Sequence, residues 1–370
     1  MGGHEGGKAG SEYLLIEVMA QGGAVGLGEV SDIESDWGAV EWDAICSLVK
    51  QALVGSDLTL RHALVSEVVA ALPTELHREL KIAIRAAIEI ALLDVVARSH
   101  GVPLYDMLGG LKRQAQPVSW VAFIGNEAGI DQEIGEKARA GFGAYKLKVG
   151  ADHDSDLERI RTTRRIAGPG AHLRVDASGE WDVQEAIEKL TEMRAIGVDA
   201  VETPIRAVAR SIAKKSPEQV NENVDDIASQ LATVRQAVDV LLIEHVSDFD
   251  DAFSAALGRH QAVDVFNVMP GQAGGVYRAQ KLIHLAEAHG IEVLLGSTVE
   301  LSPGTAAALH LGLASSGVTQ ASDLVGPGLL VDDVCETPLA YSNGTLVAPP
   351  SSGLGVNLSA EGLERLGAGE

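Results

Sequence analysis

The chain has 370 residues, of which 46% are hydrophobic, and a formal net charge of −23 from 52 acidic and 29 basic residues. This length suffices for one large α/β barrel or for two domains. The excess of acidic residues argues against nucleic-acid binding, which needs clustered Lys and Arg. No apolar run reaches the roughly 18 residues of a membrane span, and the N-terminus has no signal-peptide core. The two cysteines, Cys46 and Cys335, form no CxxC motif. We expect a soluble, cytoplasmic protein that binds neither nucleic acid nor membrane.

The first third of the chain predicts an α+β unit. Two strands are expected within residues 12–30, joined at Gly22 and Gly23, which are typical of a hairpin. Residues 42–100 have a helical pattern. The last of these helical segments carries small and apolar residues on most of its faces, which predicts that the helix is buried.

From Pro117 onward, short apolar runs alternate with helix-like segments. The expected strands are "VSWVAF", "AYKLKVG", "HLRVDASG", "VDAVETPI", "VDVLLIEHV", "VDVFNVMPG", "IEVLLGSTVE" and "ASDLV". The expected helices between them include Val183–Ile196, Val224–Ala237 and Gly275–His289. Eight strands that alternate with helices predict a parallel sheet closed into a TIM-type (β/α) barrel.

The pattern predicts three parts. Residues 1–112 are expected to form an N-terminal α+β capping domain, 113–335 the (β/α) barrel, and 336–370 a C-terminal return to the capping domain. The polar segment 206–226 is longer than a βα connection needs. Segments of this kind are usually lids or disordered loops, and this one would lie on the face of the barrel that carries function.

Charged residues stand at the ends of five of the expected strands. They are Lys146 and Lys148 on the second strand, Asp176 on the third, Glu202 on the fourth, Glu244 and His245 on the fifth, and Glu300 on the seventh. A separation of two residues puts both lysines on one face of their strand. Carboxylate oxygens are ligands that Mg²⁺ prefers, and a nearby lysine can act as a base when burial and the cation lower its pKa. A single Asp at a strand end is more often a cap or a surface residue, but the joint pattern predicts a metal-assisted site.

The motifs resemble those of the enolase superfamily, specifically its mandelate racemase and muconate lactonizing enzyme group. The resemblance covers nearly the whole chain and is closest to the muconate cycloisomerases. It rests on "AAIEIALLDVVARSHGVPLYDMLGG", "YKLKVG", "VDASGEWD", "VETPI", "GSTVELSPGTAAALHLGLA" and "SGLGVNL". It implies a barrel under an α+β cap, a small-molecule carboxylate substrate and a homo-oligomer. It also suggests that "GGHEGGKAG" is the remnant of a substrate-selecting loop.

The resemblance also implies roles for individual residues. Lys148 looks like the acid/base that moves the proton alpha to a carboxylate, and Lys146 looks like its electrostatic neighbour. Asp176 and Glu202, which are 26 residues apart, look like Mg²⁺ ligands. The metal would stabilise an enediolate by supplying positive charge.

The third metal ligand is ambiguous in the sequence. Counting back from the following helix places Ile243 at the ligand position, whereas counting back 24 residues from Met269 places His245 there. Glu244 lies between them and is chemically the best ligand, so we expect Glu244, although it would have to face inward after a shift of one residue. If Ile243 faces inward, only two protein ligands remain.

Two positions that would lie across the site from Lys148 depart from the family pattern. The muconate lactonizing members have a lysine where this chain has Met269, and the mandelate racemase branch has a histidine near Gly296. We expect Ser178, His245, Met269 and Glu300 to contact the substrate or to support the ligands.

These departures favour chemistry that needs a single base. The sequence predicts a Mg²⁺-dependent lyase or isomerase that acts through Lys148, by syn cycloisomerisation or syn β-elimination, with Met269 packing against the substrate. One alternative is an impaired or repurposed homologue. A second is a racemase or epimerase of an amino-acid derivative, which is disfavoured because it needs a base on each face.

Overall fold

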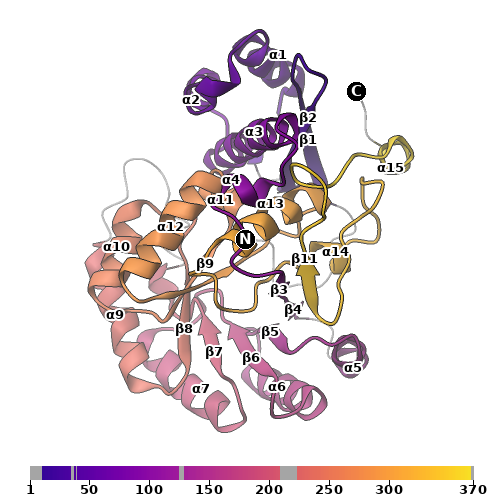
Figure 1. Cartoon of the computed structure of the whole chain (residues 1–370). Helices are drawn as coiled ribbons and strands as arrows, with labels where there is room; N and C mark the ends of the chain where they lie inside the picture. The colour runs from indigo at the N-terminus through magenta and orange to yellow at the C-terminus, as the bar shows by residue number, and fades with distance from the viewer. Residues whose placement is uncertain (1–10, 35–36, 39, 125–128, 209–222, 368–370) are drawn as a thin grey trace.

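The computed structural model describes residues 11–34, 37–38, 40–124, 129–208 and 223–367 (Figure 1). The segment "GGHEGGKAG" and most of the polar segment 206–226 lie outside these residues, so the expectations for them have no structural counterpart here. Among the described residues, no helix combines the length and apolarity that crossing a membrane would require.

The N-terminal part forms a two-stranded antiparallel sheet covered by helices, as expected. Its elements are β1 (Glu12–Met19), β2 (Val25–Ile33), α1 (Trp42–Leu53), η2 (Leu58–Leu60), α2 (Arg61–Ala71), α3 (Arg78–Ser99) and α4 (Leu104–Met107). Ala20 N–H donates to Ala24 O at 2.8 Å and closes the hairpin. Apolar residues of α3, such as Ile84 and Ile88, pack with Val30 of β2 and Leu64 of α2 in one buried cluster.

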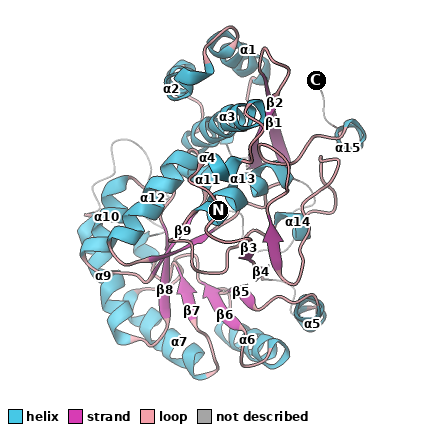
Figure 2. Cartoon of the chain, viewed as in Figure 1, coloured by secondary structure: helices cyan, strands magenta, loops and turns pink. Residues whose placement is uncertain are grey.

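The central part is a curled parallel sheet with helices on its outer side (Figure 2). Its strands are β4 (Ser119–Ala122), β5 (Ala144–Lys148), β6 (His172–Asp176), β7 (Ala200–Glu202), β8 (Leu241–His245), β9 (Val265–Val268) and β10 (Glu292–Leu295). The helices between and after them are α5 (Ile130–Arg139), α6 (His153–Ala167), α7 (Val183–Ala195), α9 (Val224–Ala237), α10 (Asp251–Arg259), α11 (Pro270–Ala273), α12 (Val276–Ala288) and α13 (Ser302–Ala314). The strands pair in the order β10-β9-β8-β7-β6-β5-β4. The structure thus contains seven of the eight expected strands, each shorter than expected, and the three named helices, whose bounds agree with the expected ones within one residue at either end.

The expected eighth strand, "ASDLV", does not form a regular strand. Ser322 exchanges backbone hydrogen bonds with Ser119 and Pro117, both at 2.9 Å, and Asp323 N–H donates to Leu295 O at 2.7 Å. The chain then turns, because Val325 N–H donates back to Asp323 O at 2.7 Å, and α14 (Gly326–Leu329) begins. The sheet therefore has seven strands. Residues 322–323 form a short bridge that is hydrogen-bonded to both edge strands, β4 and β10.

The C-terminal tail returns to the N-terminal part. Its strand β11 (Thr345–Val347) pairs antiparallel with β3 (Ala115–Pro117), and α15 (Ala360–Arg365) follows. The buried Asp94 of α3 accepts hydrogen bonds from Leu27 N–H at 2.8 Å and Leu354 N–H at 2.7 Å. One carboxylate thus joins β2, α3 and the tail.

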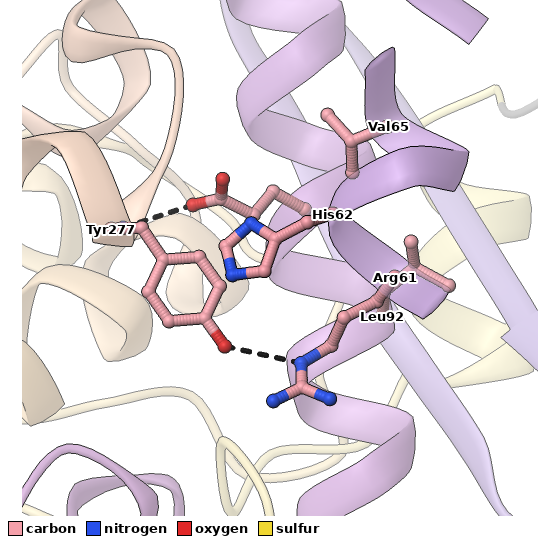
Figure 3. A pocket seen from close by; sticks show the side chains of 6 residues that line it. Arg61, His62, Val65, Leu92 and Tyr277 are labelled. Atoms are coloured by element: carbon pink, nitrogen blue, oxygen red, sulfur yellow. Dashed lines mark hydrogen bonds between the residues drawn. The ribbon is translucent and has the colours of Figure 1, made fainter. Parts of the chain in front are cut away.

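The helical cap also contacts the outer helix α12 (Figure 3). Tyr277 lies against His62, with ring centroids 4.4 Å apart, and its hydroxyl accepts a hydrogen bond from Arg61 Nε at 3.1 Å. Tyr277 N–H donates to Glu89 Oε1 at 3.0 Å. Gly275 allows this approach, because a Cβ there would collide with the Glu89 carboxylate and its φ is +131°.

Candidate active site

The lysines and carboxylates expected to act together do meet at the C-terminal ends of β5, β6 and β7. In the sheet register, Lys148 pairs with Asp176 and Asp176 pairs with Glu202. Neighbouring residues of parallel strands project to the same face. These side chains therefore share one level on the inner face of the curled sheet.

Both lysines contact the same carboxylate. Lys148 Nζ lies 2.6 Å from Asp176 Oδ2, and Lys146 Nζ lies 3.0 Å from that atom and 2.9 Å from Glu202 Oε2. Burial opposes ionisation of Asp176, but the two ammonium groups outweigh it and hold the pKa of this carboxyl below its usual value. The Lys148 side chain is 20% exposed and that of Lys146 is 7% exposed, so Lys148 is the more accessible of the two.

Two charged residues of this cluster were not anticipated from the sequence. Asp323 Oδ2 lies 3.1 Å from Lys146 Nζ, and the other oxygen of Asp323 forms an ion pair with Arg174. Arg174 pairs with Lys146 in the strand register and is fully buried. Its position two residues before Asp176 indicates the same face, and this signal was present in the sequence. Three cationic side chains thus face three carboxylates.

Ser178 supports Asp176 rather than reaching into the site. Its backbone N–H and its hydroxyl donate to Asp176 Oδ1 at 2.9 and 3.1 Å. Ser178 has φ +48°, a left-handed conformation that Asn tolerates better than most residues.

The register of β8 resolves which of its residues face inward. Ile243 pairs with Glu202, and it packs with Ala200 and Val265 in a small cluster separate from the main helix-covered core. His245, two residues further, shares the inner face, and Glu244 lies on the opposite one.

Glu244 is turned toward the outer side of the strand. Its Oε1 accepts hydrogen bonds from Thr203 Oγ1 at 2.7 Å and from His245 N–H at 3.0 Å. Burial raises the pKa of Glu244 to about 8, so this carboxyl holds its proton at neutral pH. The expectation that Glu244 is the third metal ligand stays a prediction, and its orientation and protonation do not favour it.

His245 forms a buried pair with Asp248, a residue that the sequence analysis did not single out. His245 Nε2 lies 3.0 Å from Asp248 Oδ2. Burial lowers the pKa of His245, but the Asp248 carboxylate outweighs this and the net pKa is raised. His245 Nδ1 is buried and has no hydrogen-bond partner.

Asn267 on β9 is a further missed contributor. It pairs with His245 in the register, and its Nδ2 donates to Glu202 Oε1 at 2.9 Å. It therefore links the Glu202 carboxylate to the strand that leads to Met269.

Met269 lies at the far side of the site, just before α11. Its N–H donates to Ser247 Oγ at 2.7 Å. A Cβ at Gly296 would come within 2.7 Å of Met269 Cγ and even closer to Asn267 Oδ1. The Met269 side chain thus fills the space that a side chain at position 296 would need.

The Glu300 carboxylate is hydrogen-bonded to residues of its own turn. Its carboxylate accepts hydrogen bonds from Ser297 Oγ, from Thr298 Oγ1 at 3.1 Å and from Thr298 N–H at 2.9 Å. Its neighbour Glu29 of β2 accepts hydrogen bonds from Leu301 N–H and Gly304 N–H at 2.8 Å, at the start of α13. Burial raises the pKa of Glu29 to about 7, and the nearby Glu300 charge adds to this.

Metal ligation is not preformed in this arrangement. Among the described residues, no group of three or more His, Cys, Asp or Glu side chains could hold a metal ion as it stands. The Lys146 ammonium instead contacts the two expected ligands, Asp176 and Glu202.

Comparisons with known proteins agree with the fold and the motifs. The mandelate racemase/muconate lactonizing enzyme N-terminal domain family matches residues 6–109, and the enolase C-terminal domain-like family matches residues 130–362. The chain is 30% identical over 368 residues to a chloromuconate cycloisomerase of Pseudomonas putida, with 95% of this chain and 90% of that protein covered. It is 28% identical over 352 residues to an L-Ala-D/L-Glu epimerase of Bacillus subtilis, with 94% and 89% covered.

Solved structures give the same result. The crystal structure of 2-chloromuconate cycloisomerase from Rhodococcus opacus 1CP matches with a TM-score of 0.81 and 26% identity, and the match covers 96% of this chain and 92% of that one. A substrate-liganded L-Ala-D/L-Glu epimerase from Bacillus subtilis matches with a TM-score of 0.80 and 27% identity, with 95% and 92% covered. These relatives are isomerising enzymes. The chain belongs to the mandelate racemase/muconate lactonizing enzyme group of the enolase superfamily.

Proposed function

We propose that the protein is a metal-dependent lyase or isomerase that moves a proton alpha to a carboxylate through Lys148 alone. The observation that carries this proposal is an asymmetry of the site. Lys148 reaches the inner face on one side, whereas Met269 and Gly296 occupy the other side without an ionisable group.

Lys148 is the residue suited to the proton transfer. It is the more exposed lysine, and its contact with Asp176 at 2.6 Å holds the amine at the inner face, where it can reach a substrate. Lys146 is more buried and lies between three carboxylates. Its role in the proposal is to keep positive charge beside Lys148 and toward the carboxylate of the substrate.

Two of the residues present have the donor chemistry that a divalent cation takes. Asp176 and Glu202 offer carboxylate oxygens at one level, and the Lys146 ammonium contacts both of them. The family resemblance implies Mg²⁺ as the cation. When bound, the cation supplies positive charge that favours loss of the proton alpha to the substrate carboxylate.

Met269 limits the possible reactions. A thioether can neither donate nor take a proton, so inversion of a carbon centre by a second base on that face is disfavoured. Reactions with one proton transfer on the Lys148 face remain, namely syn cycloisomerisation of a muconate-like acid and syn β-elimination. Met269 then contributes apolar contact with the substrate.

A second candidate is a homologue without the standard activity. It is favoured by the Lys146 ammonium, which contacts both expected metal ligands, Asp176 and Glu202, and by Met269. The third candidate, an epimerase of an amino-acid derivative, is supported by the relative of that name.

The proposal extends to the architecture. We propose that the bridge at residues 322–323 closes the sheet into a barrel, supported by its hydrogen bonds to β10 and to residues 117–119. The division into 1–112, 113–335 and 336–370 is supported by the β3–β11 pairing and by the contacts of Asp94. Assembly into a homo-oligomer in the cytoplasm is the family expectation.

The test is a substrate panel with a divalent cation present. cis,cis-Muconate, 2-chloromuconate, L-Ala-L-Glu and simple 2-hydroxy acids are incubated in D₂O and followed by proton NMR. We expect turnover or deuterium exchange of at least one acid, with the Lys148→Ala variant inactive. Equal turnover by wild type and Lys148→Ala would contradict the proposal, and no turnover together with no metal binding favours the second candidate.

A further inference from the structure

The backbone carbonyl of Lys148 is hydrogen-bonded to a buried arginine of the helix that follows it. Arg159 of α6 donates from Nη1 to Lys148 O at 2.7 Å and from Nη2 to Phe123 O at 2.8 Å. Arg159 is only 3% exposed, so its guanidinium lies inside the protein between the ends of β4 and β5. The guanidinium therefore binds the backbone of the residue that carries the proposed acid/base amine.

This contact begins where the pairing of β4 with β5 ends. The last pair of the two strands is Ala122 with Leu147, and Phe123 and Lys148 are the next residue on each strand. Arg159 bridges the carbonyl oxygens of these two residues. A guanidinium presents several N–H donors in a fixed planar fork, whereas a lysine ammonium has a single nitrogen. The bridge between two acceptors therefore depends on an arginine.

The peptide that joins Lys148 to Val149 is held on both sides. Its N–H, from Val149, donates to Asp176 O of β6 at 2.9 Å. Its C=O points the opposite way, as in any trans peptide, and accepts from Arg159 on the side of β4. The orientation of this peptide, and with it the position of the Lys148 side chain, therefore depends on Arg159.

Asp156, one turn before Arg159 on α6, supports the same segment. Its Oδ2 accepts a hydrogen bond from Gly150 N–H at 2.8 Å, and its Oδ1 lies 3.6 Å from Arg159 Nη1. Asp156 is also 3% exposed. One buried acid–base pair of α6 thus fixes the backbone of residues 148–150.

Resting on the proposed function, we propose that Arg159 is a positioning residue for Lys148. Because Arg159 is buried, it acts through the backbone of Lys148 and not on the substrate itself. A misplacement of about 1 Å at a reacting group can cost about 100-fold in rate. Loss of the Arg159 contacts should therefore lower kcat and leave KM nearly unchanged.

The first measurement detects the hydrogen bond without a substrate. Lys148 followed by Val149 is the only Lys-Val dipeptide in the sequence. The full chain labelled with carbonyl-¹³C lysine and ¹⁵N valine therefore gives a single carbonyl–amide cross peak by NMR, which reports the Lys148 carbonyl. We expect its ¹³C shift to change in Arg159→Met and to stay in place in Arg161→Met, which replaces an exposed arginine of the same helix. An unchanged cross peak in Arg159→Met would overturn the inference.

The second measurement is steady-state turnover of the acid identified by the panel. We expect kcat to fall about 10–100-fold in Arg159→Met, with KM changed by less than about threefold. Arg159→Lys keeps the charge beside Asp156 but offers one nitrogen, so its kcat should lie between those of Arg159→Met and the wild type. This milder variant carries the test if Arg159→Met fails to fold. Arg161→Met should change neither kcat nor KM.

The outcomes separate this inference from the proposed function. If Lys148→Ala is inactive while Arg159→Met and Arg159→Lys turn over at the wild-type rate, the inference is overturned and the proposed function stands. A loss that appears only in KM, or an equal loss in Arg161→Met, assigns Arg159 a general structural role and also overturns the inference. If no acid of the panel turns over, or if Lys148→Ala turns over like the wild type, both are overturned.

Discussion

The two sides of the proposed site differ in charge and in packing. On the side of β5, β6 and β7, Lys146, Lys148, Asp176 and Glu202 form a network of contacts between 2.6 and 3.0 Å. On the side of β9 and β10, Met269 lies over Gly296, and neither residue carries charge. In the proposed reaction, Lys148 on the charged side would move the proton, and Met269 on the other side would shape the space for a substrate.

The largest effect is expected for Lys148→Ala on the charged side. General acid–base catalysis contributes about 10²–10⁴-fold, so proton exchange in D₂O should fall by at least this factor. Lys50→Ala, which replaces an exposed lysine of α1, is the matched control and should leave the rate unchanged. A loss below tenfold would mean that the charged side is not the source of the proton transfer.

Asp323→Asn tests whether the stability of the protein depends on the buried ion pair between Asp323 and Arg174. It leaves Arg174 buried beside a neutral amide, and breaking a buried ion pair from one side costs about 3–5 kcal/mol. Asp239→Asn removes the partner of the exposed Arg194 and should cost less than about 1 kcal/mol. Denaturant unfolding measures both. Equal costs would show that the buried cluster tolerates an unpaired cation.

Glu29→Gln tests the contact between the cap and the start of α13. Folding raises the pKa of Glu29 from 4.5 to about 7, chiefly through burial. The folded state therefore binds the proton of the Glu29 carboxyl more tightly than the unfolded state does. This difference stabilises the fold by about 3 kcal/mol below pH 4.5, and the stabilisation is lost as the pH rises through 7. We expect the free energy of unfolding of Glu29→Gln to fall less steeply between pH 4.5 and 7.5 than that of the wild type. Parallel curves for the two proteins would contradict this.

The smallest effect is expected on the apolar side. Gly296→Ala places a Cβ against Met269 and Asn267, and overpacking of this kind costs about 1–3 kcal/mol. Met269→Ala removes one of the two obstacles, so the double variant should be less destabilised than the sum of the single ones. Strict additivity would mean that Met269 does not fill this space.

The sequence predicted the parts of the molecule that follow from periodicity. The alternation of strands and helices, the placement of both lysines on one face, and the positions of Asp176 and Glu202 at strand ends all follow from periodicity along strands of a parallel sheet. What it could not predict depends on single-residue register and on side-chain partners. The register pairs Ile243 with Glu202, so an isoleucine faces inward at the level of the two expected ligands and Glu244 lies on the other face.

The site residues that the sequence analysis did not identify were missed for the same reasons. Asp323 lies in a segment that was expected to be a strand but forms a two-residue bridge, so its inward side chain could not be inferred from alternation. Arg174 was readable from its spacing to Asp176, because two residues along a strand return to the same face. Asp248 and Asn267 are recognisable only through their contacts with His245 and Glu202.

The asymmetry of the two sides is tested most directly by the stereochemistry of proton exchange. The acid identified by the panel is incubated in D₂O with the wild type and with Met269→Lys, and the configuration at the labelled carbon is determined by NMR. We expect the wild type to introduce deuterium on one face only and to give a single configuration, with Met269→Lys gaining exchange on the second face. Formation of both configurations by the wild type would contradict the one-base account.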